Sequence, residues 1–225
     1  MVPLGHTQCP PYADSKKEYR MQSSELTPIF PLNTPIFPGC KMHLQIFEQR
    51  YLDMVSRCMR QGSGFIVALL CPGSEQQEVN RPGQAADDNV PFYLVGTYVV
   101  ITDFGQLGNG LLSITIEGQT RQQLEQIRLQ DNGLWIGTSH VISDEGELSA
   151  DPPQPFRELL KELLELSGMN KLITDPHKLD SQQLMNYLIM LLPLASSTKQ
   201  SLLTTNNLKQ RCDDLLDCLE HMAQK

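Results

Sequence analysis

The sequence predicts an α+β protein in which a strand-rich part precedes a helical part. Short apolar segments with turn signals between them recur from about residue 29 to residue 143, which is typical of an antiparallel sheet. Prolines and acidic residues then gather between Ser143 and Pro155. Beyond this stretch leucines recur at helical spacing. The change in composition near residue 144 therefore marks the boundary between the two parts.

The strand-rich part opens with the apolar run Ile29–Leu32, and residues 41–46 alternate between polar and apolar as a half-buried strand does. The first helix is expected directly afterwards. Its apolar residues recur every three or four positions and predict one buried face: Phe47, Tyr51, Met54, Val55 and Cys58. Gly62 is a typical residue to end that helix.

Further strands are expected from periodicity and from β-branched and aromatic content, at residues 64–71, 92–103, 111–117, 119–129 and 134–143. The pair Asn109-Gly110 predicts a hairpin between two of them. The polar stretch 72–90 is expected to be a long mobile loop. Six or seven short strands, mostly antiparallel, favour a small barrel or a sandwich.

Three helices are expected in the second part. The first has a leucine face up to Gly168, the second begins at a cap formed by Asp180 or Ser181, and the third runs to Leu219. We therefore divide the chain into three segments: a flexible leader (1–25), a strand-rich subdomain (26–145) and a helical subdomain (146–225).

Charge and composition narrow the classes of partner. The chain has a net charge of −8 and a pI near 5.1, which disfavours a nucleic-acid backbone as the ligand. No apolar stretch reaches the length of a membrane-spanning helix, and the leader lacks the apolar core of a signal peptide. The six cysteines form no C-x-x-C pair and are expected to be free thiols. We therefore expect a cytoplasmic protein.

Motifs for catalysis are missing from the sequence. No Walker A loop, H-E-x-x-H pair or G-x-S-x-G elbow occurs, and the glycines near Gly108 do not follow the dinucleotide-binding order. His43 and His140 lie on expected strands and could meet in space, but a strand histidine is more often a surface residue than a metal ligand. We therefore expect neither an enzyme nor a cofactor nor a metal site.

Two segments near the start of the strand-rich part resemble a known family. The first is Ile29-Phe30-Pro31-Leu32-Asn33-Thr34-Pro35-Ile36-Phe37-Pro38-Gly39, and the second runs from Leu44 through Ile46-Phe47-Glu48-Gln49-Arg50-Tyr51 to Met54. Together they are similar to the opening of the Lon protease N-terminal, substrate-binding domain. Phe92–Thr97, the stretch Glu117-Gly118 with Arg121, and Leu208–Leu219 resemble later segments of that family.

The resemblance implies a PUA-like β-barrel that carries one helix and is followed by a helical bundle. It implies a free-standing, non-catalytic module that binds unfolded or tagged protein segments, an adaptor in proteostasis, without the ATPase and peptidase domains of Lon proteases. A protease or a chaperone is an expected partner. The peptide-binding residues are expected at the start of the first helix: Phe47, Glu48, Arg50 and Tyr51.

Three alternatives stay open. PUA-like barrels elsewhere bind RNA, although the stretch from Asp144 to Lys225 holds 13 acidic and 8 basic residues and so repels phosphate. The barrel mouth could instead form an enzyme pocket with converging polar groups. A homo-oligomer or a purely structural role is the third alternative.

Overall fold

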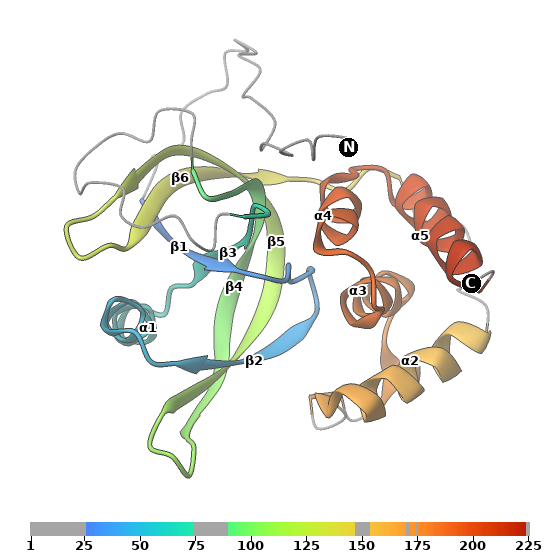
Figure 1. Cartoon of the computed structure of the whole chain (residues 1–225), viewed down its shortest axis with the longest axis horizontal. Coiled ribbons are helices and arrows are strands. Elements are labelled where there is room, and N and C mark those ends of the chain that lie inside the picture. Colours follow the sequence, from blue (N-terminus) through green and yellow to red (C-terminus); the bar gives the residue numbers. More distant parts are fainter. Residues whose placement is uncertain (1–25, 74–89, 147–153, 170–171, 174, 224–225) are drawn as a thin grey trace, which may run out of the picture.

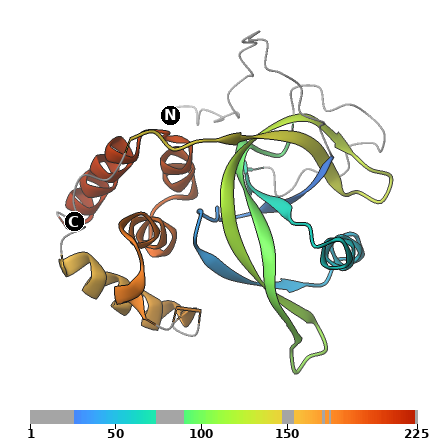
Figure 2. The same ribbon diagram turned by 180° about the vertical axis from the view of Figure 1, so that it is seen from behind.

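The computed structural model describes residues 26–73, 90–146, 154–169, 172–173 and 175–223. The predicted leader (1–25) and most of the predicted loop (72–90) lie outside these residues. The fold is mixed α+β, as the sequence predicts. One side of the molecule is a curved six-stranded sheet with a single helix, and the other side holds the C-terminal helices (Figures 1 and 2).

The strands of the sheet are β1 (Thr27–Leu32), β2 (Lys41–Ile46), β3 (Phe65–Leu70), β4 (Phe92–Gln106), β5 (Leu112–Leu129) and β6 (Trp135–Ile142). Their order is β2-β5-β4-β3-β1-β6, and β6 also pairs with β5. Five strands therefore form a closed circuit of pairings, while β2 is attached to β5 alone. Only β1 and β3 run parallel among these pairings.

The strand β5 corrects one expectation, because it is a single strand where two segments were expected on either side of Gly118. Gly118 does not interrupt the strand. A Cβ atom at this position would lie 2.3 Å from the Phe37 carbonyl oxygen, so a glycine is needed for the β1–β2 connection to approach the sheet. The backbones are also joined there by hydrogen bonds between Gly39, Cys40 and Gly118.

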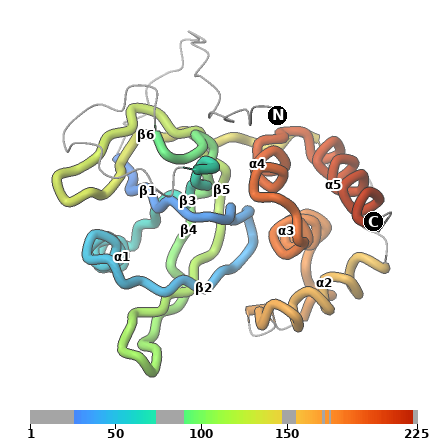
Figure 3. Tube along the Cα trace, in the orientation of Figure 1, coloured from blue at the N-terminus to red at the C-terminus, as the bar shows by residue number. Residues whose placement is uncertain are grey.

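Helix α1 (Gln49–Gln61) stands apart from the other helices (Figures 1 and 3). Its predicted buried face is confirmed for Tyr51, Met54, Val55 and Cys58. Gly62 ends the helix in the left-handed conformation, at φ 61°. Phe47 was expected on the same face, but it precedes the helix and is 69% exposed. Glu48 is the N-cap and has extended backbone angles, so the chain becomes helical only after it.

The C-terminal helices are α2 (Gln154–Ser167), α3 (Ser181–Leu191), α4 (Ser196–Thr204) and α5 (Leu208–Ala223), with a short 3₁₀ turn, η3 (Pro176–Lys178), before α3. The predicted cap at Asp180 is confirmed, since its side chain accepts a hydrogen bond from the Gln183 amide. Helix α4 was not expected. It contains few apolar residues, and the buried ones are Leu202 and Leu203.

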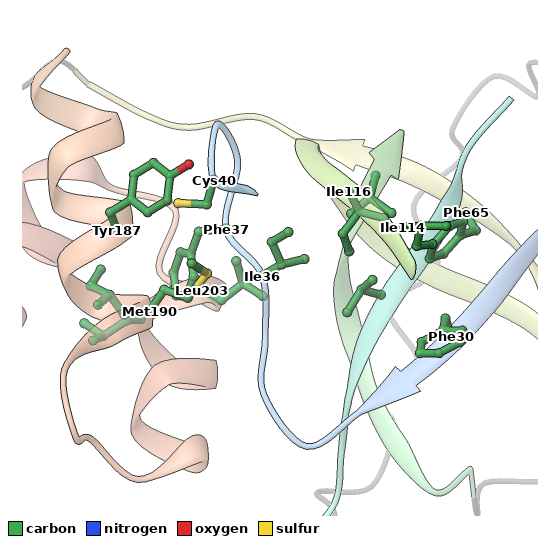
Figure 4. Close-up of a cluster of buried hydrophobic side chains, with 14 of the residues drawn as sticks. Phe30, Ile36, Phe37, Cys40, Phe65, Ile114, Ile116, Tyr187, Met190 and Leu203 are labelled. Atoms are coloured by element: carbon green, nitrogen blue, oxygen red, sulfur yellow. The ribbon is translucent and has the colours of Figure 1, made fainter. Parts of the chain in front are cut away.

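The main hydrophobic core is shared by the sheet and the C-terminal helices. The connection between β1 and β2 lies between the two: its residues Phe37 and Cys40 lie beside the helices, and Ile36 lies toward the sheet (Figure 4). Tyr187, Met190 and Leu203 approach from α3 and α4. A second, smaller core fills the other side of the sheet around Trp135. Of the described helices, none is long and apolar enough to cross a membrane.

Four of the described cysteines are free: Cys40, Cys58, Cys212 and Cys218. The expectation of free thiols throughout is wrong for Cys71, which is disulfide-bonded.

Candidate functional site

The edge of the sheet at β2 is the first feature that can receive another molecule. Strand β2 pairs with β5 in register from Lys41 opposite Glu117 to Ile46 opposite Leu112. Its second edge pairs with no strand in the described part of the chain. The β4–β5 hairpin extends past β2, and α1 follows the end of β2 (Figure 1). We call the strand β2 together with Phe47 and the first turn of α1 the β2–α1 corner.

Backbone groups along β2 alternate between its two edges. The Gly118 amide donates to the Cys40 carbonyl, which places this pair in hydrogen-bonded register. By antiparallel alternation, Met42, Leu44 and Ile46 also turn their backbone groups toward β5. Lys41, His43 and Gln45 therefore turn theirs toward the open edge. The Lys41 amide donates there to the Tyr187 hydroxyl at 2.8 Å, so α3 closes the edge at Lys41.

Side chains also alternate between the two faces of this part of the sheet. Leu44 lies opposite Ile114, and Ile114 lies opposite Phe104, so the three share one apolar face. His43 and Gln45 project from the other face and are exposed. On that face the His43 ring lies 3.0 Å from the Thr115 hydroxyl.

Two large aromatic side chains in this part of the sheet lie open to solvent. Phe47 is 69% exposed and follows β2, and Phe104 is 61% exposed and lies in the projecting part of the β4–β5 hairpin. Exposed phenylalanine on a folded domain loses the stabilisation that burial would give it. The position of Phe47 beside the open strand edge therefore favours a binding role, and Phe104 lies two strands away on the same sheet.

The other three predicted site residues hold the corner in place. Arg50 forms an ion pair with Glu48 at 2.7 Å and donates a hydrogen bond to the Gly133 carbonyl at 2.8 Å. Its guanidinium also lies 4.7 Å from the ring centre of Tyr51. Tyr51 is buried against Phe30, with ring centres 4.2 Å apart, and burial raises its pKa. The four residues therefore lie together; Phe47 is the most exposed, Glu48 and Arg50 are half-buried, and Tyr51 is buried.

A second feature is a charged cluster where the sheet meets the helices. Asp144 accepts from Arg121 at 2.8 Å and from Arg211 at 2.6 Å, and both arginines are buried. Arg121 also donates to the carbonyl of Leu203 at 2.9 Å. Burial lowers the pKa of Arg121, the charge of Arg211 lowers it further, and Asp144 opposes both effects.

A hollow of about 480 Å³ opens beside this cluster. It lies between the β1–β2 turn, the middle of β5, the end of β6 and the start of α3, with Pro38, Arg121, Asp144 and Gln182 among its lining residues. Arg121 and Arg211 donate to backbone carbonyls, to the Asn206 side chain and to Asp144. We therefore interpret the cluster as the joint between sheet and helices.

His43 and His140, which the sequence allowed to lie close together, have different partners. His43 contacts Thr115 on β5, whereas His140 lies on β6 beside Glu125. Among the described residues, no group of three or more His, Cys, Asp or Glu side chains is arranged to hold a metal ion.

Sequence reasoning missed the open edge of β2 and the exposure of Phe104. The alternation of residues 41–46 predicted a strand, but whether a strand lies at an edge depends on pairings across the chain. Phe104 carried a usable signal, because it stands just before the turn that contains Asn109-Gly110.

Residues 27–221 match the ATP-dependent protease La (LON) substrate-binding domain. The match covers most of the chain, so the chain belongs to this family. The resemblance inferred from the segments around Pro38-Gly39 and Glu48 is thereby confirmed.

Two curated relatives are Lon proteases. The chain is 22% identical to Lon protease of Brevibacillus choshinensis over 202 residues, which is 86% of this chain. It is 24% identical to Lon protease 1 of Bdellovibrio bacteriovorus over 212 residues, which is 90% of this chain. These matches cover 24% and 25% of the two relatives, so the chain spans about a quarter of their length.

Two solved structures are similar over most of the chain. The Lon N-terminal domain protein from Xanthomonas campestris has a TM-score of 0.59 and 30% identity, and the alignment covers 86% of this chain and 98% of that one. The N-terminal domain of Mycobacterium avium complex Lon protease has a TM-score of 0.52 and 15% identity, with 86% and 97% covered. The second likeness shows the fold alone.

Proposed function

We propose that this chain recognises segments of other polypeptides by non-covalent binding, as a substrate-recognition module of the Lon type. The observation that carries the proposal is the match to the substrate-binding domain over residues 27–221. The β2–α1 corner supports it, because exposed Phe47 stands beside an open strand edge on a rigid support. Unfolded segments offer apolar side chains and unpaired backbone groups, which such a surface can bind.

We infer that the closed circuit of β1, β3, β4, β5 and β6 is a PUA-like barrel. We also infer that the module delivers bound clients, as an adaptor in the cytoplasm, to a protease or chaperone and carries out no chemistry itself. The net charge of −8 gives no support to the alternative of RNA binding.

Binding of an unfolded client tests the proposal directly. The probe is fluorescently labelled α-lactalbumin, reduced and carboxymethylated so that it cannot refold, with fluorescence anisotropy as the readout. We expect saturable binding that Phe47→Ser weakens about tenfold, as an aromatic contact at the centre of an interface would. Phe47 is largely exposed, so the variant should unfold at the same temperature as the parent protein.

The matched control is Leu166→Ser, which removes an apolar side chain that is 85% exposed on α2. We expect this variant to bind the client as the parent does. If the parent protein does not bind the unfolded client, the proposed function is wrong. If Leu166→Ser and Phe47→Ser weaken binding equally, the β2–α1 corner is not the site.

A further inference from the structure

We propose that the bound segment adds to the sheet as an extra strand along the open edge of β2, with apolar residues at alternate positions. This inference rests on the proposed function and specifies how the client is held. Its first support is the backbone of the edge. The N–H and C=O groups of His43 and Gln45 point away from β5, and no other described residue bonds to them.

The second support is the lack of protection along this edge. Exposed edge strands usually carry charges, prolines or bulges that prevent pairing with another chain. In β2 the only charged side chain is Lys41, and its ammonium group lies 3.6 Å from the Glu117 carboxylate. His43 and Gln45 occupy the middle of the edge, and the register with β5 is continuous from Lys41 to Ile46.

The limits of the edge define the length of the partner segment. At one end the Lys41 amide is occupied by the Tyr187 hydroxyl of α3. At the other end Glu48 begins the turn into α1, which the Arg50 ion pair holds in place. Between these limits the open edge covers Met42 to Phe47, which fits one short extended segment.

The two faces of β2 define the chemistry of the partner. A side chain on the added strand beside Leu44 would extend the apolar row formed by Leu44, Ile114 and Phe104. The next side chain would lie with exposed His43 and Gln45 in solvent. The segment is therefore expected to alternate apolar and polar residues, with exposed Phe47 beside one of its ends.

The first test removes one backbone donor from the edge. Gln45→Pro removes an outward amide that bonds to no other described residue, and the proline ring blocks an incoming strand. Gln45→Ala is the matched control, because it loses the side chain and keeps the amide. We expect Gln45→Pro to weaken binding of the unfolded α-lactalbumin about tenfold, and Gln45→Ala to leave it unchanged.

The second test leaves the protein unaltered. The probe is a capped peptide of alternating valine and threonine, prepared with N-methyl groups on the valines or on the threonines. Antiparallel addition directs the threonine amides to β2 and parallel addition directs the valine amides there, so one methylated peptide should lose binding and the other keep it. Equal behaviour of the two methylated peptides would overturn the proposal.

The outcomes separate failure of this inference from failure of the proposed function. If the parent protein binds the unfolded client and Gln45→Pro, folded as judged by its unfolding temperature, binds it equally well, recognition takes place elsewhere. Sedimentation of the protein without the client tests whether a second copy of this chain occupies the edge. A dimer that Gln45→Pro converts to a monomer would overturn the client segment as the natural occupant of the edge.

Discussion

Asp144 and Arg211, which lie 67 positions apart in the chain, are joined by an ion pair of 2.6 Å beneath the surface between sheet and helices. Asp144 also holds Arg121, so one carboxylate compensates two buried guanidinium groups. The side chain of Asp144 is 22% exposed, while those of the two arginines are 1% and 0% exposed. The stability of this joint therefore depends on one acidic group.

The first prediction concerns that group. Asp144→Asn leaves Arg121 and Arg211 facing each other without a counter-charge, and breaking a buried ion pair in this way costs about 3–5 kcal/mol. We expect the free energy of unfolding, measured by urea titration, to fall by that amount. Asp213→Asn on the exposed side of α5 is the control and should change it by less than about 0.5 kcal/mol. A small effect of Asp144→Asn would show that the arginines find other acceptors.

The second prediction concerns the close approach at Gly118. An added methyl group would meet the Phe37 carbonyl oxygen at 2.3 Å, so Gly118→Ala must displace the β1–β2 connection. We expect this variant to lower the free energy of unfolding by about 1–3 kcal/mol in urea titrations. Gly108→Ala in the β4–β5 turn is the comparison, because nothing lies within 4 Å of the added methyl group. Equal stability of the two variants would contradict the proposed strain.

The third prediction distinguishes residues that hold the β2–α1 corner in place from residues that contact the client. Arg50→Ala removes the ion pair with Glu48, the hydrogen bond to Gly133 and the contact with the Tyr51 ring. Because Arg50 is partly exposed, we expect a loss of only about 1–2 kcal/mol in the free energy of unfolding. Client binding should weaken as well, since Phe47 loses its rigid support.

Arg57→Ala on the exposed face of α1 is the control and should preserve both stability and binding. Arg50→Lys should recover little, because a lysine cannot make the forked contacts to Glu48 and Gly133. Unchanged client binding by Arg50→Ala would separate the support from the contact residue and limit the site to Phe47 and the strand edge.

Local patterns were sufficient to predict most elements of this fold. The buried face of α1, the glycine at its end and the cap at Asp180 depend on residues a few positions apart, and all three are confirmed. The position of Phe47 outside the helix could not be predicted in the same way. Its spacing from Tyr51 fits the helical period, but the extended backbone of Glu48 removes it from the helix.

Features that depend on distant residues could not be predicted from the sequence. Arg121 was recognised only as part of a family resemblance, and nothing in its local sequence indicates that Asp144 and Leu203 accept its hydrogen bonds. The same applies to the open edge of β2, which exists because no described strand pairs with β2 on the side away from β5, and because Tyr187 of α3 occupies only the amide of Lys41. Periodicity predicts which face of a strand is buried but not which strand lies at the edge.

The last prediction concerns Lys199, a buried lysine on α4 whose ammonium group donates to the Met190 carbonyl at 2.6 Å. Burial lowers its pKa below the ordinary value of 10.5. Between the lowered pKa and 10.5 the unfolded chain binds more protons than the folded one, so stability rises with pH. Comparison with Lys199→Met isolates this effect, because the remaining titratable groups are common to both proteins.

We therefore expect the stability of the parent protein relative to Lys199→Met to increase as the pH rises from about 7 toward the ordinary lysine pKa, and to level off above it. Urea titrations of both proteins across this range measure the difference. A difference that decreases with rising pH would mean that the folded protein holds the Lys199 proton more tightly than the unfolded chain does. In that case the hydrogen bond to Met190 would outweigh the cost of burial.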